Sequence, residues 1–255
     1  MPSCHTGNYT SLLENEDLAS LSDCQLKCGE KTWKLHKSII CIHSPFFLKA
    51  LTGNFQEAKT GVVELDADQF SVDHVDCVIK AMYSQSLGHI GGLVASALGS
   101  EILETYDFCF RVWEVANFLG VEPLCASILR SLHNLNHTLV LQLRSNYNKK
   151  PDYPGAKFID YLFNIAHMAY EDLPGAPSIN GSRGGPRGVV IDLFSRAGYI
   201  LTNNATVLQR MADFPDLACQ VLRLSNMEKC TMGKSMWGGA RSEKGSGSSP
   251  YLDYW

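Results

Sequence analysis

The chain has 255 residues, of which 45% are hydrophobic, so it can bury a sizeable core in one domain with an extension or in two small domains. Its net charge of -4 provides no basic surface for nucleic acid, and its most apolar stretch, residues 90–98, is much shorter than the ~20 residues that span a bilayer. The N-terminus lacks the pattern of a secretory signal and the nine cysteines form no dense framework, so we expect a soluble intracellular protein of the cytoplasm and/or nucleus, with reduced thiols.

The first predicted elements are a short helix and a β-hairpin. Leucines spaced through residues 12–21 indicate the helix, although acidic residues interrupt the period. Residues 24–28 alternate apolar and polar side chains, as in a strand with one buried face. Gly29-Glu30 fits a two-residue turn, and residues 31–35 resume the alternation on a return strand.

Two short helices are predicted next. The first covers Ser38, Ile39, Ile40 and Ile42, which we expect to form a helical turn or two with an apolar face. In the second, Ser44 is the N-cap and Pro45 takes the first helical position, where its missing N–H has no consequence. Apolar residues then recur at helical spacing until Gly53, which we expect to end the helix.

A polar loop, a strand, a helix and an insertion follow in that order. Residues 54–61 predict the loop and residues 62–65 a third strand. Apolar side chains at i, i+3, i+4 and i+7 between Val75 and Met82 indicate an amphipathic helix. The stretch near residues 87–103 is rich in Gly, Ala and Ser, and we interpret it as an insertion.

The remaining chain predicts helices. One runs from Thr105 and closes at Gly120, and another opens at Pro123 and carries apolar residues to Leu132, so the two should pack as an antiparallel hairpin. After a polar link at residues 145–155, apolar spacing indicates helices around residues 158–169, 190–197, 208–211 and 217–224, with a mobile loop at residues 173–188 and a disordered tail at residues 231–255.

Five segments in this order resemble the BTB/POZ domain family: Ser22-Asp23, His36-Lys37, Ser44-Pro45-Phe46-Phe47, Phe55-Gln56-Glu57 and Val63-Glu64-Leu65-Asp66. The resemblance implies an α+β fold, a small sheet flanked by helices, over residues 12–133, followed by a mostly helical region over residues 134–230. The chain shows no kelch, ankyrin or zinc-finger repeat pattern, and so is similar to the compact family members common in fungi.

The resemblance also implies roles for individual residues. Asp23, His36, Lys37, Ser44 and Phe47 occupy signature positions of the BTB fold. Lys37 is expected to pair with Asp23 as a buried ion pair near a dimer interface.

Phe55 and Glu57 match the hydrophobic-x-Glu motif of BTB proteins that serve as substrate adaptors for cullin-3 ubiquitin ligases. An apolar anchor beside a carboxylate suits a binding hot spot. The alternative is that Phe55 covers the core and Glu57 is simply solvated.

These features predict a non-enzymatic interaction module without a cofactor, which self-associates and recruits cullin-3 while its C-terminal helices hold an unknown substrate protein. The alternative is a dimerising scaffold or transcriptional co-regulator with no ligase role. Without a basic helix or zinc finger, neither function involves direct binding to nucleic acid, and no membrane contact is expected.

An enzyme or a metal site is the remaining alternative. Asp23, His36 and Ser44 are the residue types of a catalytic triad, but Ser44 has no nucleophile elbow around it. Cys24 and Cys28 are four residues apart, and so are His133 and His137, although a zinc site would need these pairs to converge. We therefore assign no catalytic and no metal-binding residues.

Overall fold

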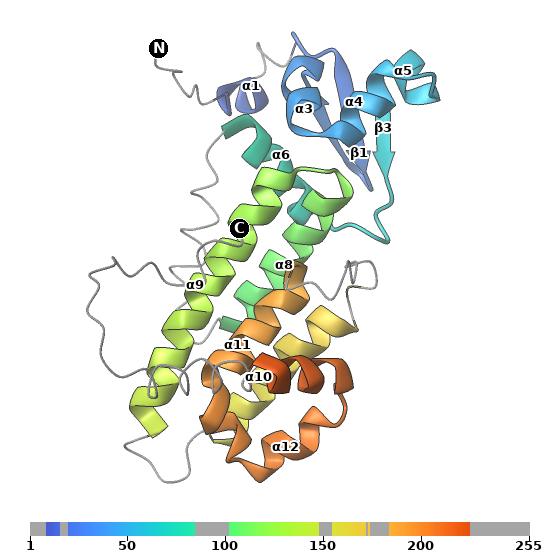
Figure 1. Cartoon of the computed structure of the whole chain (residues 1–255). Coiled ribbons are helices and arrows are strands. Elements are labelled where there is room, and N and C mark those ends of the chain that lie inside the picture. The colour runs from blue at the N-terminus through green and yellow to red at the C-terminus, as the bar shows by residue number, and fades with distance from the viewer. Residues whose placement is uncertain are drawn as a thin grey trace, which may run out of the picture.

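The computed structural model describes residues 9–15, 20–84, 102–147, 155–171, 173 and 184–224. A small sheet with short helices lies at one end of the molecule, and a pair of long helices runs from it towards the C-terminal helices (Figure 1). The predicted α+β fold, with a small sheet flanked by helices and a mostly helical region after it, is confirmed.

The sheet has three strands in the order β2-β1-β3. β1 (Cys24–Cys28) and β2 (Lys31–Leu35) are antiparallel and are joined by Gly29-Glu30, as predicted. Gly29 has a φ of 56°, a left-handed conformation that favours glycine. β3 (Val62–Leu65) lies parallel to β1 on its other side. β1 is therefore the central strand of the sheet, and its alternate residues are buried.

Short helices cover this sheet and bury a common core with it. They are α1 (Ser11–Glu14), α3 (Lys37–His43), α4 (Pro45–Thr52), α5 (Gln56–Thr60) and α6 (Val72–Ser84). Leu26 of β1, Phe47 of α4 and Tyr83 of α6 are fully buried together in that core.

Three predictions in this part of the chain need correction. Residues 56–60 form α5 instead of a loop; the helix buries no residue, so it has no apolar period to detect. Ile42 is 80% exposed, because it lies about 200° around α3 from the buried Ile40. The N-terminal helix is only the short α1, and Leu21 is exposed; residues 16–19 lie outside the described part of the chain.

The predicted helical hairpin is α8 (Ile102–Phe118) followed by α9 (Glu122–Tyr147). Gly120 turns the chain between them with a φ of 72°, and a Cβ there would approach the Pro45 ring within 3.2 Å. The expected insertion lies outside the described residues, except that its last two residues belong to α8.

α9 is longer than predicted. Its apolar face continues past Leu132 through Leu135, Leu139 and Leu143, all of them buried, and the helix extends into the predicted polar link. No break in the helix marks the boundary expected after residue 133, so the division of the chain into domains stays a prediction.

The C-terminal region consists of helices, as predicted. They are α10 (Ala156–Tyr170), α11 (Gly185–Thr202), α12 (Ala205–Met211) and a last helix at residues 215–224. α11 starts at Gly185, five residues before the expected start at residue 190 and inside the predicted loop, and it is kinked at Gly198. The rest of that loop, apart from residues 173 and 184, and the predicted tail lie outside the described residues.

A buried polar cluster joins α8, α9 and α11. Asn136 of α9 is fully buried; its side chain accepts a hydrogen bond from the Tyr106 hydroxyl and donates to the Val189 carbonyl and the Asp192 carboxylate. Asp192 also contacts His133 at 3.1 Å. A shift of α11 relative to α8 and α9 would break these hydrogen bonds and leave buried polar groups unpaired, which is destabilising. The cluster therefore favours one arrangement of α11 on α8 and α9.

Candidate functional site

The corner between α4 and α5 carries Phe55 and Glu57, the two residues of the hydrophobic-x-Glu motif. α4 ends at Thr52, Phe55 directly precedes α5, and Glu57 lies in the first turn of α5. The two helices pack against each other beside β3 (Figure 1). The motif is therefore presented by a compact corner of the sheet-bearing end and does not depend on the C-terminal helices.

Gly53 sets the position of the Phe55 ring. The φ of Gly53 is -81°, so its backbone conformation does not require glycine. A Cβ there would lie 2.6 Å from the Lys49 carbonyl oxygen and 3.0 Å from the Phe55 ring. Because the ring lies against bare backbone, any larger residue at position 53 would have to displace it.

The motif is accessible. Phe55 is 58% exposed, and Leu48 on the neighbouring α4 is also exposed, whereas Glu57 is half-buried. The alternative in which Phe55 covers the core is wrong. An exposed aromatic side chain next to a carboxylate is a feature that a partner protein can use as an anchor and a charge.

Three of the signature residues have structural partners. The Lys37 backbone N–H donates to the Asp23 carboxylate at 2.7 Å. Asp23 is exposed, and this backbone hydrogen bond takes the place of the buried ion pair that the resemblance implied. The backbone N–H of the buried His36 donates to the Tyr83 hydroxyl at 2.8 Å, and the same hydroxyl lies 3.0 Å from His36 Nδ1.

The other two signature residues, Ser44 and Phe47, hold α4 in place. Ser44 is fully buried; its hydroxyl donates to the Leu119 carbonyl at 2.5 Å and accepts from the Phe47 N–H at 3.2 Å. One side chain thus caps α4 and ties it to the α8–α9 turn. Asp23, His36 and Ser44 each contact a different partner, so they do not form the hydrogen-bonded chain of a catalytic triad.

The candidate metal ligands lie apart. Cys24 and Cys28 are buried on the core face of β1, and burial, with Asp23 nearby, raises the pKa of the Cys24 thiol to about 12. His133 contacts Asp192 of α11. Among the residues described, no group of three or more His, Cys, Asp or Glu side chains could hold a metal ion.

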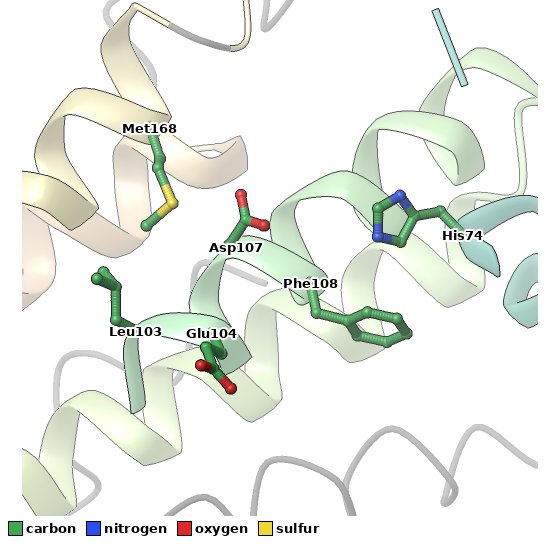
Figure 2. A pocket seen from close by; sticks show the side chains of 6 residues that line it. All are labelled: His74, Leu103, Glu104, Asp107, Phe108 and Met168. Atoms are coloured by element: carbon green, nitrogen blue, oxygen red, sulfur yellow. The ribbon is translucent and has the colours of Figure 1, made fainter. Parts of the chain in front are cut away.

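Sequence reasoning missed a cleft between α6, α8 and α10. His74, Leu103, Glu104, Asp107, Phe108 and Met168 line it (Figure 2). No motif joins these residues, since Met168 is 94 positions from His74 in the sequence. The packing of both α6 and α10 against α8 brings them together.

The comparisons with known proteins identify the sheet-bearing end. The family model described as BTB/POZ domain matches residues 11–97. Residues 11–97 form a BTB/POZ domain. The BTB domain is a protein-interaction module, and the α4–α5 corner with Phe55 and Glu57 belongs to it.

Curated relatives match this BTB region as well. The chain is 30% identical to human Kelch-like protein 41 over 111 residues, which is 40% of this chain and 18% of the relative. It is 29% identical to the mouse Kelch-like protein 41 over 91 residues, 34% of this chain and 15% of the relative. The chain therefore matches less than a fifth of the length of these relatives, in the BTB region only.

No helix in the described part of the chain combines the length and the apolar character that crossing a membrane requires.

Proposed function

We propose that this chain is a non-enzymatic adaptor that recruits cullin-3 through the α4–α5 corner of its BTB domain and holds a substrate protein with its C-terminal helices. The observation that carries this proposal is the exposed Phe55 ring, which lies close to the Gly53 backbone two residues before Glu57. A partner that buries such a ring gains an anchor at the interface, with a carboxylate beside it.

An intracellular location fits the state of the cysteines. All seven cysteines in the described residues are free thiols, and burial raises the pKa of several of them, including Cys24, Cys77 and Cys109. Thiols of this kind are inert and persist in a reducing compartment. These thiols support the proposal that the adaptor works in the cytoplasm and/or nucleus.

Binding of the purified chain to the N-terminal region of cullin-3 tests the adaptor function. Phe55→Ala should weaken binding by about 2 kcal/mol or more, roughly thirtyfold, because it removes an anchoring ring from the interface. Glu57→Lys should weaken binding by a similar amount, because it replaces the carboxylate that would select the partner with a group of the opposite charge. Isothermal titration calorimetry would give both values.

Two variants serve as matched controls for this experiment. Tyr161→Ala removes a 43% exposed aromatic from α10, and Asp213→Lys reverses an exposed carboxylate just after α12. Both should bind as the unchanged chain does. If the folded, unchanged chain fails to bind, or if the controls lose as much affinity as the motif variants, the adaptor proposal is wrong.

A second candidate function is a self-associating scaffold or co-regulator without a ligase role. The observation that favours it is the exposure of Ile42 and Leu21, at 80% and 65%. Leu21 lies shortly before β1, and Ile42 lies near the end of α3. Large apolar side chains left exposed can be covered when a second copy of the chain binds.

Self-association makes its own prediction. The unchanged chain should be a dimer by light scattering, and Ile42→Glu should raise the dimer dissociation constant by about thirtyfold or more, because a carboxylate would be buried without a partner. Leu141→Glu, at a 51% exposed site on α9, should leave the dimer intact. A monomeric unchanged chain at tens of micromolar would contradict this function and leave the cullin proposal untouched.

A further inference from the structure

The α6–α8–α10 cleft has the size of a ligand site. It is an open depression of about 510 Å³, within the roughly 300–1,000 Å³ typical of binding clefts. α6 lies within the BTB domain and contributes His74, and α8 follows that domain in the sequence. α10 contributes Met168 from the C-terminal region. Such junctions between packed elements are where ligand sites commonly form.

The apolar part of the lining comes from Leu103 and Phe108 of α8 and Met168 of α10. Figure 2 shows Leu103 and Met168 on one side of Asp107 and Phe108 on the other side, beside His74. All three are only half-buried, so part of each side chain remains available for a ligand. The Phe108 ring also meets His74 edge-on, with centroids 5.3 Å apart, which fixes its orientation.

The polar part of the lining is acidic. Glu104 and Asp107 supply two carboxylates, and Figure 2 shows Asp107 between Met168 and His74. Arg111 lies 3.7 Å from Asp107 but also 3.6 Å from Glu114, so its charge is shared with a carboxylate outside the cleft. Burial lowers the pKa of His74, which therefore adds no positive charge at neutral pH.

A ligand that matches this lining needs a cationic head on an apolar stem. Arginine provides both: its methylene stem would cover Leu103 and Met168, and its planar guanidinium can stack on an aromatic ring while it donates to a carboxylate. The segment that precedes α8 in the sequence, residues 85–101, contains neither Lys nor Arg, so it supplies no such group.

We propose that this cleft binds an arginine side chain, flanked by apolar residues, from an extended segment of a partner protein. The site shares no residue with the α4–α5 corner. A partner held there would occupy the chain independently of cullin-3.

The test uses the full chain with ¹³C-methyl-labelled methionines and the peptide acetyl-Leu-Arg-Leu-amide. The Met168 methyl signal, assigned with Met168→Leu, should shift and saturate as peptide is added. The same peptide with citrulline, which keeps the shape of arginine without its charge, should bind about tenfold more weakly or worse. Equal binding of the two peptides, or no shift of Met168, would overturn the proposal.

Variants of the chain locate the interaction. Glu104→Gln/Asp107→Asn should lower the affinity for the arginine peptide by about tenfold or more, while Glu122→Gln/Asp213→Asn removes two exposed carboxylates elsewhere and should not. Thermal unfolding of all variants shows that they are folded. If Arg183→Gln shifts the Met168 signal without any peptide, the chain's own arginine occupies the cleft, and the proposal of a partner is wrong.

Discussion

Asn136→Asp is expected to lower the free energy of unfolding by about 4 kcal/mol, although the two side chains have nearly the same shape. The change removes the amide that donates to the Val189 carbonyl and to Asp192. It also introduces a buried carboxylate about as far from Asp192 as the amide it replaces, 3.1 Å in the unchanged chain. The two like charges would repel each other where little water can screen them.

The charge state of Asp192 supports this estimate. Burial alone would raise the pKa of Asp192, but hydrogen bonds from His133, Arg196 and Asn136 outweigh it and hold the pKa below its usual value. Asp192 is therefore ionised at neutral pH, and a second carboxylate at position 136 would meet a full negative charge.

Asn134→Asp provides the matched control, because Asn134 is an exposed residue of the same helix two positions away. Its effect should remain within about 0.5 kcal/mol, which is usual for surface changes. Urea unfolding of both variants gives the comparison. A difference of less than 1 kcal/mol between them would show that the buried cluster contributes little to stability.

Phe47→Ala is the second large effect, with an expected loss of about 4 kcal/mol. Phe47 is fully buried in the core beneath α4, and its ring packs edge-on against Phe46 at 5.5 Å. Truncation removes apolar contacts and leaves a cavity that the surrounding strands and helices cannot readily fill. We expect the variant to unfold at clearly lower urea concentration and to lose partner binding through instability.

Phe55→Ala makes the same chemical change at an exposed site eight residues away. It should alter stability by about 0.5 kcal/mol or less, so its effect on cullin binding can be attributed to the interface. Chemical denaturation should therefore separate Phe47, which maintains the fold, from Phe55, which we assign to recognition. Similar losses at both positions would show that Phe55 has a structural role.

Local patterns were enough to predict much of the BTB domain. The alternation in residues 24–35 with Gly29 at the turn gives the hairpin, and Ser44-Pro45 gives the start of α4, because strand period, turn and cap are properties of adjacent residues. The continuation of α9 was also readable, since the apolar spacing runs on from Leu132 to Leu143.

Features that depend on distant residues could not be predicted. Asn136 is a polar residue on an apolar helix face, and nothing near it in the sequence reveals that its partner Asp192 lies 56 residues further on. The close approach of Gly53 to Phe55 depends on how the backbone packs, and the exposure of Ile42 depends on which side of α3 faces the sheet. Tertiary packing decides such positions, whatever their local preference.

α9 also affects how two proteins bound to different parts of the chain would be placed relative to each other. A straight helix of its 26 residues is about 39 Å long, and it packs against α8 and α11 without a break (Figure 1). α9 is therefore a continuous connection between the sheet-bearing end and the C-terminal helices. A protein bound to the C-terminal helices would keep a set distance and angle from a protein bound at the α4–α5 corner. In a ligase, this fixed geometry would restrict which lysines of a substrate come within reach of the transferred ubiquitin.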